Sequence, residues 1–512
     1  MHGTCASVGV DSWWEANTAR GRTIPCRDVF KIHLPEWQAR GIVHRVQDSP
    51  NVIGTQPARV LGPIDATCVV IGAIIGVGIF FTPSKVAGLV GSETLVLTAW
   101  GIGGIIALCG ALAFAELGGF YHGSGAQYEI IRDSYGPMLG FLFVFCIATV
   151  IEPGSIGIMA VICAQNLLDA MGASKGTIDQ WTTPLSLALI LMLAGANILG
   201  ARWGATIGNL SVLAKTLALL AVVGLAMYAT AQGTHVPATT QPAIASGKSG
   251  IVAALLACMI PVLFSYGGWQ QVLWVAGEVR NPRRNLPLSI VLGVTIVIAV
   301  YLLANWAYLR LLGVDGVAGS ETLAADAVGA VLPNLGSRIV AGAVAVSAFG
   351  VLNVQFLTAP RLIYGLAADG RFFKPFARIN PSFGTPIAAM MLLTVFAVVM
   401  LLGAGWIAVE GEDADDKLDQ LLTAVVVVDG LFFVLTGIAV IVLRYKRANA
   451  DRPFRVPGYP LVPILFALGE LGLIVGSYVN AELRNPAIIS AGWVIAGVVV
   501  YWVLFRTTAK RT

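Results

Sequence analysis

Long apolar segments recur along the whole chain, and they restrict its fold more than any other feature of the sequence. A run of about 18 or more apolar residues is long enough to cross the hydrocarbon core of a bilayer. The chain of 512 residues is 57% hydrophobic and only 12% charged, whereas soluble domains carry roughly a quarter charged residues. We therefore expect an all-α membrane protein that crosses the bilayer many times.

Twelve spans are predicted between the Gly, Pro and charged residues that interrupt the apolar runs. They lie near residues 63–86, 94–120, 138–170, 184–200, 206–230, 251–277, 288–312, 337–368, 385–403, 421–445, 460–480 and 486–506. Residues 1–60 are mixed in character and lack the pattern of a signal peptide. We expect them to form a cytoplasmic N-terminal tail.

Basic residues concentrate in alternate loops, which predicts the orientation of the chain. With a cytoplasmic N-terminus, the inside loops carry Arg132, Arg202, Arg280, Arg283, Arg284, Arg371, Lys374, Arg378, Arg444, Lys446, Arg447, Arg452 and Arg455. The outside loops between spans 3 and 12 carry only Lys175, Lys248, Lys417 and Arg484. Both termini are thus expected in the cytoplasm, and residues 507–512 form the C-terminal end. The inner (plasma) membrane is the expected location.

Spans 1 and 6 are interrupted near their middle. The interrupting residues are Gly72, Gly76, Gly78 and Pro83 in span 1, and Pro261, Gly267, Gly268 and Gly277 in span 6. Glycine destabilises a helix interior by about 1 kcal/mol, and backbone groups freed inside a bilayer need protein partners or a cavity. Two broken helices at matching positions indicate a transporter built from inverted repeats. Close packing of helices on glycine is the alternative explanation.

The repeats would be spans 1–5 (residues 61–230) and spans 6–10 (residues 251–445), followed by two further spans in residues 460–506. A half-helix presents free N–H groups at its amino end and free C=O groups at its carboxyl end. The first attracts a carboxylate and the second an ammonium group. Two breaks could therefore bind a zwitterionic amino acid without a charged side chain.

Several segments resemble, in order, the motifs of the amino acid–polyamine–organocation (APC) superfamily. These are Gly76-Val-Gly-Ile-Phe80, Tyr121-His-Gly-Ser-Gly-Ala-Gln-Tyr128, Phe264-Ser-Tyr-Gly-Gly-Trp269, Glu278-Val-Arg-Asn-Pro-Arg-Arg-Asn-Leu-Pro287, Ala368-Asp-Gly-Arg371 and Arg452-Pro-Phe-Arg455. The stretches around Trp269 and Glu152 look closest to L-type amino acid transporters and bacterial amino acid exchangers. The resemblance implies a five-plus-five inverted repeat, like that of the leucine transporter, with discontinuous helices 1 and 6 and an amino acid substrate.

The resemblance and the half-helix argument place the substrate on the same residues. They are Ile74, Ile75, Gly76, Val77 and Gly78 in span 1, and Phe264, Ser265 and Gly267 in span 6. Val77 departs from the family, which often has Ser there. Phe264 matches an aromatic side chain that closes over the substrate in relatives, and Trp269 is a second gate candidate. Packing between helices is the alternative for both rings.

Lys215 lies inside span 5, where an unpaired cation costs several kcal/mol and indicates a function. In sodium-independent members of the superfamily, a lysine of helix 5 resembles a stand-in for a bound sodium ion. It would contact helix 1 carbonyls near Ile74 or Ile75, and it could also carry a proton. The alternative is a lysine that extends to the cytoplasmic interface.

Three of the carboxylates within the spans are candidates for a functional or structural role. Asp429 in span 10 is expected either to bind a proton or face the substrate route, or else to line an outer vestibule. Glu152 stands where many L-type relatives have Arg, so no role is transferred to it. Glu116, near the inner end of span 2, is expected to be structural.

A secondary transporter is the favoured function, working by exchange or by proton coupling and without sodium. Apolar residues at the presumed site favour a neutral amino acid. A polyamine or other organic cation is an alternative substrate, and a passive channel is an alternative mechanism. An enzyme is not expected, because the five histidines lie outside the spans and neither GxSxG nor HExxH occurs.

The expected partners are the amino acid substrate, the lipid bilayer and, for a coupled mechanism, protons. The seven cysteines form no CxxC pair, and none lies in a predicted outside loop. We therefore expect no metal site, no cofactor and no partner joined by a disulfide. Nucleic acid is not an expected partner either.

Overall fold

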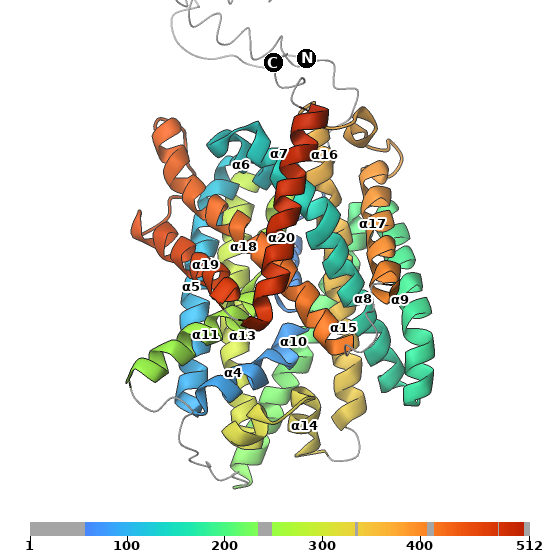
Figure 1. Cartoon of the computed structure of the whole chain (residues 1–512), viewed down its shortest axis with the longest axis vertical. Coiled ribbons are helices and arrows are strands. Elements are labelled where there is room, and N and C mark those ends of the chain that lie inside the picture. Colours follow the sequence, from blue (N-terminus) through green and yellow to red (C-terminus); the bar gives the residue numbers. More distant parts are fainter. Residues whose placement is uncertain (1–56, 234–247, 333–335, 407–413, 480, 506–512) are drawn as a thin grey trace, which may run out of the picture. The chain divides into compact units, whose positions relative to one another are not determined.

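The protein folds into helices joined by short connections (Figure 1). A computed structural model describes residues 57–233, 248–332, 336–406, 414–479 and 481–505. The predicted terminal segments, apart from residues 57–60, lie outside these ranges, as do Cys5 and Cys26. The five cysteines in the described ranges are free thiols.

The twelve predicted spans are all present as helices or pairs of helices. In the first half they are α3 (Pro63–Ile74) with η2 (Gly78–Phe80) and α4 (Thr82–Val90), α5 (Glu93–Phe120), α7 (Pro137–Cys146) with η3 (Ile147–Ile151) and α8 (Glu152–Ala170), α9 (Lys175–Ile198), and α10 (Ala201–Ala231). The short helix α6 (Ala126–Tyr135) connects spans 2 and 3.

The second half continues in the same manner. Its spans are α11 (Lys248–Tyr266) with α12 (Gln271–Trp274), α13 (Pro282–Ala318), α15 (Gly336–Thr358) with α16 (Pro360–Ala368), α17 (Ile387–Trp406), α18 (Ala414–Lys446), α19 (Leu461–Val479), and α20 (Ala481–Val500) with η6 (Tyr501–Phe505). The short connecting helices are η4 (Ala276–Glu278), α14 (Leu323–Gly329) and η5 (Lys374–Ala377). Within the described residues, ten helical stretches are long and apolar enough to span a membrane, and α3 and part of α17 are shorter apolar helices.

Matching spans of the two halves pack against each other. Helix α5 contacts α13, α8 contacts α15, α9 contacts α17, and α3 contacts α12, so each contact joins spans that are five apart. Small residues allow the close approach: a Cβ atom on Gly104 of α5 would lie 3.1 Å from a methyl carbon of Ile298 on α13. Four of the five matching pairs thus touch, and the five-plus-five inverted repeat itself stays a prediction.

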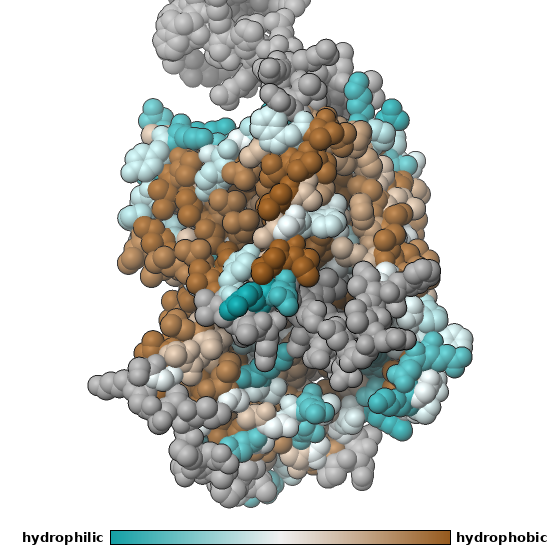
Figure 2. All heavy atoms as spheres, in the orientation of Figure 1, coloured by the Kyte–Doolittle hydropathy of each residue, from teal (hydrophilic) through white to brown (hydrophobic). Residues whose placement is uncertain are grey.

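The outer surface of the helix bundle is apolar, as contact with lipid tails requires. Large hydrophobic side chains such as Ile489 on α20, Val503 on η6 and Leu468 on α19 are more than half exposed. Figure 2 shows apolar side chains over α17, α19 and α20, with hydrophilic residues at the upper rim of the same face. The length and number of the helices, together with this surface, make the chain a multi-pass membrane protein.

The basic loops gather at one end of the bundle, which we name the arginine-rich face. It comprises residues 121–136, 199–202, 275–284, 369–386 and 444–460. Helices α6 and α16 lie at this end in Figure 1, and α4 and α14 lie at the opposite end.

Candidate functional site

The first span breaks between α3 and α4. Helix α3 ends at Ile74, and Ile75 leaves the helical conformation with φ −69° and ψ 86°. One turn of 3₁₀ helix, from Gly78 to Phe80, then leads into α4. Glycine at position 78 gives room for span 6, since a Cβ there would lie 3.0 Å from the Ser265 hydroxyl oxygen. The break therefore separates the carbonyl end of α3 from the amide end of α4.

The second span breaks between α11 and α12, and it touches the first break. Helix α11 ends at Tyr266, and Gly268 takes φ +120° before α12 begins at Gln271. A Cβ on Gly268 would lie 2.6 Å from the carbonyl oxygen of Ala73 in α3. Glycine is needed at this position both for the backbone conformation and for the close approach of the two breaks.

A tyrosine of α13 holds the two breaks together. The hydroxyl of Tyr301 lies 3.0 Å from the Ile74 carbonyl oxygen and 3.2 Å from the Ser265 carbonyl oxygen. Its ring contacts Trp100 and Tyr266 at centroid distances of 5.6 and 5.2 Å. The hydroxyl thus bridges carbonyl groups at the ends of the two half-helices, of which the Ile74 carbonyl also accepts from the Gly76 amide at 2.7 Å.

A cavity of about 150 Å³ lies where the breaks meet. Its lining includes seven of the eight predicted substrate contacts, namely Ile74, Gly76, Val77, Gly78, Phe264, Ser265 and Gly267. The eighth, Ile75, is not in the lining, because its carbonyl accepts hydrogen bonds from Lys215 and Ser347. Residues of both breaks therefore line one space.

A second, larger cavity adjoins this one. Val77, Met159 and Phe264 line both cavities, and the larger has a volume of about 430 Å³. It lies among α4, α8, α14 and α15, toward the end of the bundle away from the arginine-rich face (Figure 1).

Trp269, the other predicted gate residue, lies elsewhere. Its side chain is 1% exposed and lines neither cavity. The ring packs against Phe433, Phe466 and Phe114 at centroid distances of 5.2, 5.9 and 6.1 Å. Packing between helices, the alternative explanation, therefore accounts for Trp269. Phe264 is the remaining candidate for a gate.

Lys215 of α10 is fully buried beside the first break. Its ammonium donates to the Gly72 carbonyl oxygen at 2.8 Å and also to the Ile75 carbonyl oxygen. A cation is favourable at the carboxyl end of a helix, where carbonyl groups lack intrahelical partners. Lys215 therefore holds the end of α3 in place and does not extend to the interface.

Carboxyl and amide side chains form the wall of the small cavity next to span 6. Glu152 of α8, Asp429 of α18 and Glu470 of α19 all line it. The Gln271 amide donates to Glu152 at 3.5 Å, and the Gln270 amide donates to Asp429 at 3.4 Å. The π-helical turn η3 immediately precedes Glu152, and such turns occur often at functional sites.

Sequence reasoning missed several members of this wall. Glu470 lies in the apolar segment Leu461–Val479, where a carboxylate is a signal of function, so the sequence alone could have indicated it. Gln270 and Gln271 follow the second break directly, and Tyr301 lies in α13. Nothing in the residue type of these three marks them as neighbours of the breaks.

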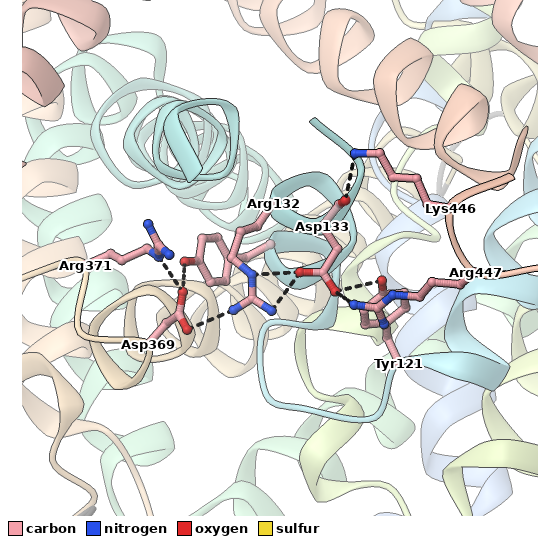
Figure 3. A network of polar contacts seen from close by, with 8 residues as sticks. Tyr121, Arg132, Asp133, Asp369, Arg371, Lys446 and Arg447 are labelled. Carbon is pink, nitrogen blue, oxygen red and sulfur yellow. Dashed lines mark hydrogen bonds and ion pairs between the residues drawn. The ribbon is translucent and has the colours of Figure 1, made fainter. Parts of the chain in front are cut away.

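The arginine-rich face is closed by a set of ionic contacts that we name the α6 network (Figure 3). Asp369, which follows α16, accepts hydrogen bonds or ion pairs from Tyr128 at 2.6 Å, Arg371 at 2.8 Å and Arg132 at 2.9 Å. Tyr128 and Arg132 belong to α6, so these contacts tie α6 to the end of span 8.

The second centre of the α6 network is Asp133. It accepts from Arg447, after α18, at 2.6 Å and from Tyr121 at 3.0 Å. The ammonium of Lys446 donates to the Ser134 carbonyl oxygen at 2.8 Å. Helix α6 is thereby connected to both span 8 and span 10 at one end of the bundle.

Glu129 lies on α6 beside these pairs, outside the membrane spans. Burial raises the pKa of Glu129 from 4.5 to about 7, and neighbouring Arg132 opposes this shift. The carboxyl group lies against Gly123, where a Cβ would come within 2.2 Å of its oxygen. The arginine-rich face therefore contains a group that titrates near neutral pH.

Two further buried carboxylates near this face are paired. Glu116, at the end of α5, accepts from Arg444 at 2.6 Å and from the Val456 amide at 2.8 Å. Glu278 pairs with Arg361 at 2.8 Å, and both side chains are almost fully buried. These contacts connect helix ends and lie outside the lining of the small cavity.

Comparison with known proteins covers nearly the whole chain. The sequence pattern of the family described as amino acid permease matches residues 61–505. The serine/threonine exchanger SteT of Bacillus subtilis is 27% identical over 453 residues, which are 88% of this chain and 98% of the exchanger. The b(0,+)-type amino acid transporter 1 of Homo sapiens is 28% identical over 447 residues, 86% of this chain and 88% of that protein. The human large neutral amino acids transporter small subunit 2 is 27% identical over 455 residues, 88% and 81% of the two chains.

Proposed function

The chain belongs to the amino acid permease family, and on this premise we propose that it is a secondary active transporter that carries an amino acid across a membrane by alternating access. The observation that carries the proposal is the meeting of two broken helices at one cavity. The free amides after the first break suit the substrate carboxylate, and the carbonyls at the end of α11 suit its ammonium group.

The two cavities support a carrier mechanism. The small cavity adjoins a larger one toward one end of the bundle, and the α6 network closes the other end. A carrier holds its substrate in a site that opens to one side at a time, whereas a channel needs a continuous path. We assign Phe264 as the gate toward the larger cavity.

Charge in the loops supports an orientation. The arginine-rich face carries the basic loops, so we assign it to the cytoplasm, together with both termini. The larger cavity then opens to the outside. We further propose the inner (plasma) membrane as the location.

Lys215 supports transport without sodium. Its ammonium already occupies the carbonyl oxygens at the end of α3, where a bound cation would otherwise stabilise the break. Exchange of amino acids and symport with a proton are both compatible with this geometry. The names of the relatives, which include a serine/threonine exchanger and a transporter of large neutral amino acids, support an amino acid as the substrate.

The test is uptake of radiolabelled amino acids by the purified protein in proteoliposomes. Vesicles are empty, preloaded with unlabelled amino acids, or given an inward proton gradient, each with and without sodium. We expect uptake that saturates, that requires either preloading or the proton gradient, and that does not change with sodium. Absence of uptake for every amino acid would contradict the proposal, and flux without saturation or trans-stimulation would indicate a channel.

A further inference from the structure

The small cavity has an excess of acidic side chains over basic ones. Glu152, Asp429 and Glu470 line it from three different spans, and none of its described lining residues is Lys, Arg or His. Lys215, the buried cation nearby, donates to the carbonyls of α3 and is absent from the lining. Carboxylates buried without a cation are unfavourable, so this wall favours a ligand that brings positive charge.

The unpaired atoms of the same wall show which hydrogen-bonding groups such a ligand should have. Glu152 Oε2, Gln270 Oε1 and Gln355 Oε1 have no hydrogen-bond partner among the described residues, and their side chains are 3%, 3% and 2% exposed. All three residues line the cavity, and all three atoms are acceptors.

The donors of this wall, in contrast, are already used. The Gln270 amide nitrogen donates to Asp429, and the Gln355 amide nitrogen donates to the Ser155 hydroxyl. The carboxylate of Asp429 fixes the orientation of the Gln270 amide, because only the nitrogen end can donate. The wall is therefore short of donors and rich in acceptors. Ammonium and guanidinium groups are donors only, with three and five N–H bonds, respectively.

The position of the wall relative to the breaks defines which part of the substrate it would contact. Gln270 and Gln271 follow Gly267 and Gly268 within a few residues, and they contact Asp429 and Glu152. The carboxylates thus lie about one side chain away from the break that would hold the backbone of an amino acid.

We infer that the cavity selects an amino acid whose side chain carries a positive charge, with the terminal ammonium or guanidinium group bound by Glu152, Asp429 and Glu470. This inference rests on the proposed function, in which the helix breaks bind the α-amino and α-carboxylate groups. It replaces the expectation of a neutral substrate, which took account of Ile74, Val77, Phe264 and Trp269 but not of Glu470. Trp269 is not in the cavity lining, so that expectation loses one of its four apolar residues.

The experiment compares substrates that differ in charge but little in shape. Binding to the purified full-length protein is measured by calorimetry, and uptake is measured in proteoliposomes, for arginine against citrulline and for lysine against norleucine. Loss of a charge-assisted contact corresponds to about tenfold in affinity or more. We expect arginine and lysine to bind at least that much more tightly than their neutral counterparts.

Substitutions in the cavity wall then test whether these carboxylates cause the preference for a cationic substrate. In Glu152→Gln, Asp429→Asn and Glu470→Gln, the advantage of the cationic substrate should fall several-fold, while citrulline or norleucine still binds. Asp179→Asn, an exposed site on α9, is the matched control and should keep the full preference. Thermal denaturation in detergent identifies any variant that fails to fold, and the two remaining variants then decide the result.

The outcomes separate this inference from the proposed function. If neutral amino acids are transported while arginine and lysine neither bind nor compete, the inference is overturned and the transporter assignment stands. If the cationic preference exists but survives in all three variants, the assignment to these carboxylates is overturned. If the variants instead lose proton-driven uptake of neutral substrates with no change in charge preference, the wall binds protons and the inference is wrong. If no amino acid binds, the proposed function fails first.

Discussion

At the scale of single residues, Lys215 links the first break to the rest of the bundle. Its ammonium satisfies the Gly72 and Ile75 carbonyls from a fully buried position. A nearby serine, Ser347, donates to the Gly76 carbonyl at 3.1 Å. The end of α3 therefore depends on side chains of α10 and α15 for its unpaired backbone groups.

Replacement of Lys215 tests this dependence. We predict that Lys215→Met lowers uptake at least tenfold, because the Gly72 carbonyl would be left buried without its side-chain donor, at a cost of about 1–3 kcal/mol. The measurement is initial-rate uptake in proteoliposomes, with and without sodium. Lys175→Met, on the exposed first turn of α9, is the control and should transport normally. Full activity of Lys215→Met would show that the ammonium has no role in the break.

The presence of a charged residue type inside an apolar segment is enough to single out Lys215, Asp429 and Glu152 from the sequence. They were not sufficient to show that Glu152 and Asp429 lie on one cavity wall, since these residues are far apart in the sequence. The direction in which a side chain points from its helix also could not be predicted from the sequence. Phe264 faces the cavities, and Trp269 faces an aromatic cluster, although both rings belong to one motif.

At the scale of elements, the two broken helices depend on glycine where they touch. The spans and the position of the breaks follow from the sequence, because Gly and Pro interrupt apolar runs in a recognisable way. The contact between the breaks does not follow from it. Tyr301 and Gly268 create that contact by a hydroxyl bridge and by the absence of a Cβ atom, and both effects need coordinates to be seen.

Gly268 gives the sharpest test of the contact. We predict that Gly268→Ala destabilises the protein by about 1–3 kcal/mol, because φ +120° is unfavourable for alanine and its Cβ would lie 2.6 Å from the Ala73 oxygen. Gly224→Ala, on α10 where a Cβ meets no atom within 4 Å, is the control and should leave stability unchanged or slightly raised. The melting temperature in detergent and the uptake rate are measured for both. Equal behaviour of the two variants would contradict the proposed role of Gly268.

At the scale of the whole molecule, the α6 network closes one end while the larger cavity adjoins the site from the other. Transport by alternating access requires these ion pairs to separate when the arginine-rich face opens. Surface ion pairs are individually weak, typically up to about 1 kcal/mol, so the network can hold the closed state without preventing its opening.

Glu129 makes the stability of this end depend on pH. Its pKa is raised from 4.5 to about 7 by burial, so the folded state binds the proton more tightly than the unfolded state. The stabilisation is fully present below about pH 4.5 and is lost as the pH rises through 7. We predict that the free energy of unfolding falls less between pH 5 and 8 for Glu129→Gln than for the wild type, by at most about 3 kcal/mol. The melting temperatures of the two proteins in detergent, measured across this pH range, report the difference. Parallel curves for the two proteins would show that Glu129 does not titrate in this range.

The central claim is that an amino acid binds where the two breaks meet, and protection of one cysteine tests it most directly. Val77 lines both cavities, so Val77→Cys, in a background without the native cysteines, places a thiol at the site. The rate of labelling by a hydrophilic thiol reagent is measured with and without a transported amino acid, and Asp179→Cys on the surface serves as the control. We predict that the substrate slows labelling at position 77 several-fold and leaves position 179 unchanged. Equal labelling of position 77 with and without a saturating substrate would contradict a site at the helix breaks.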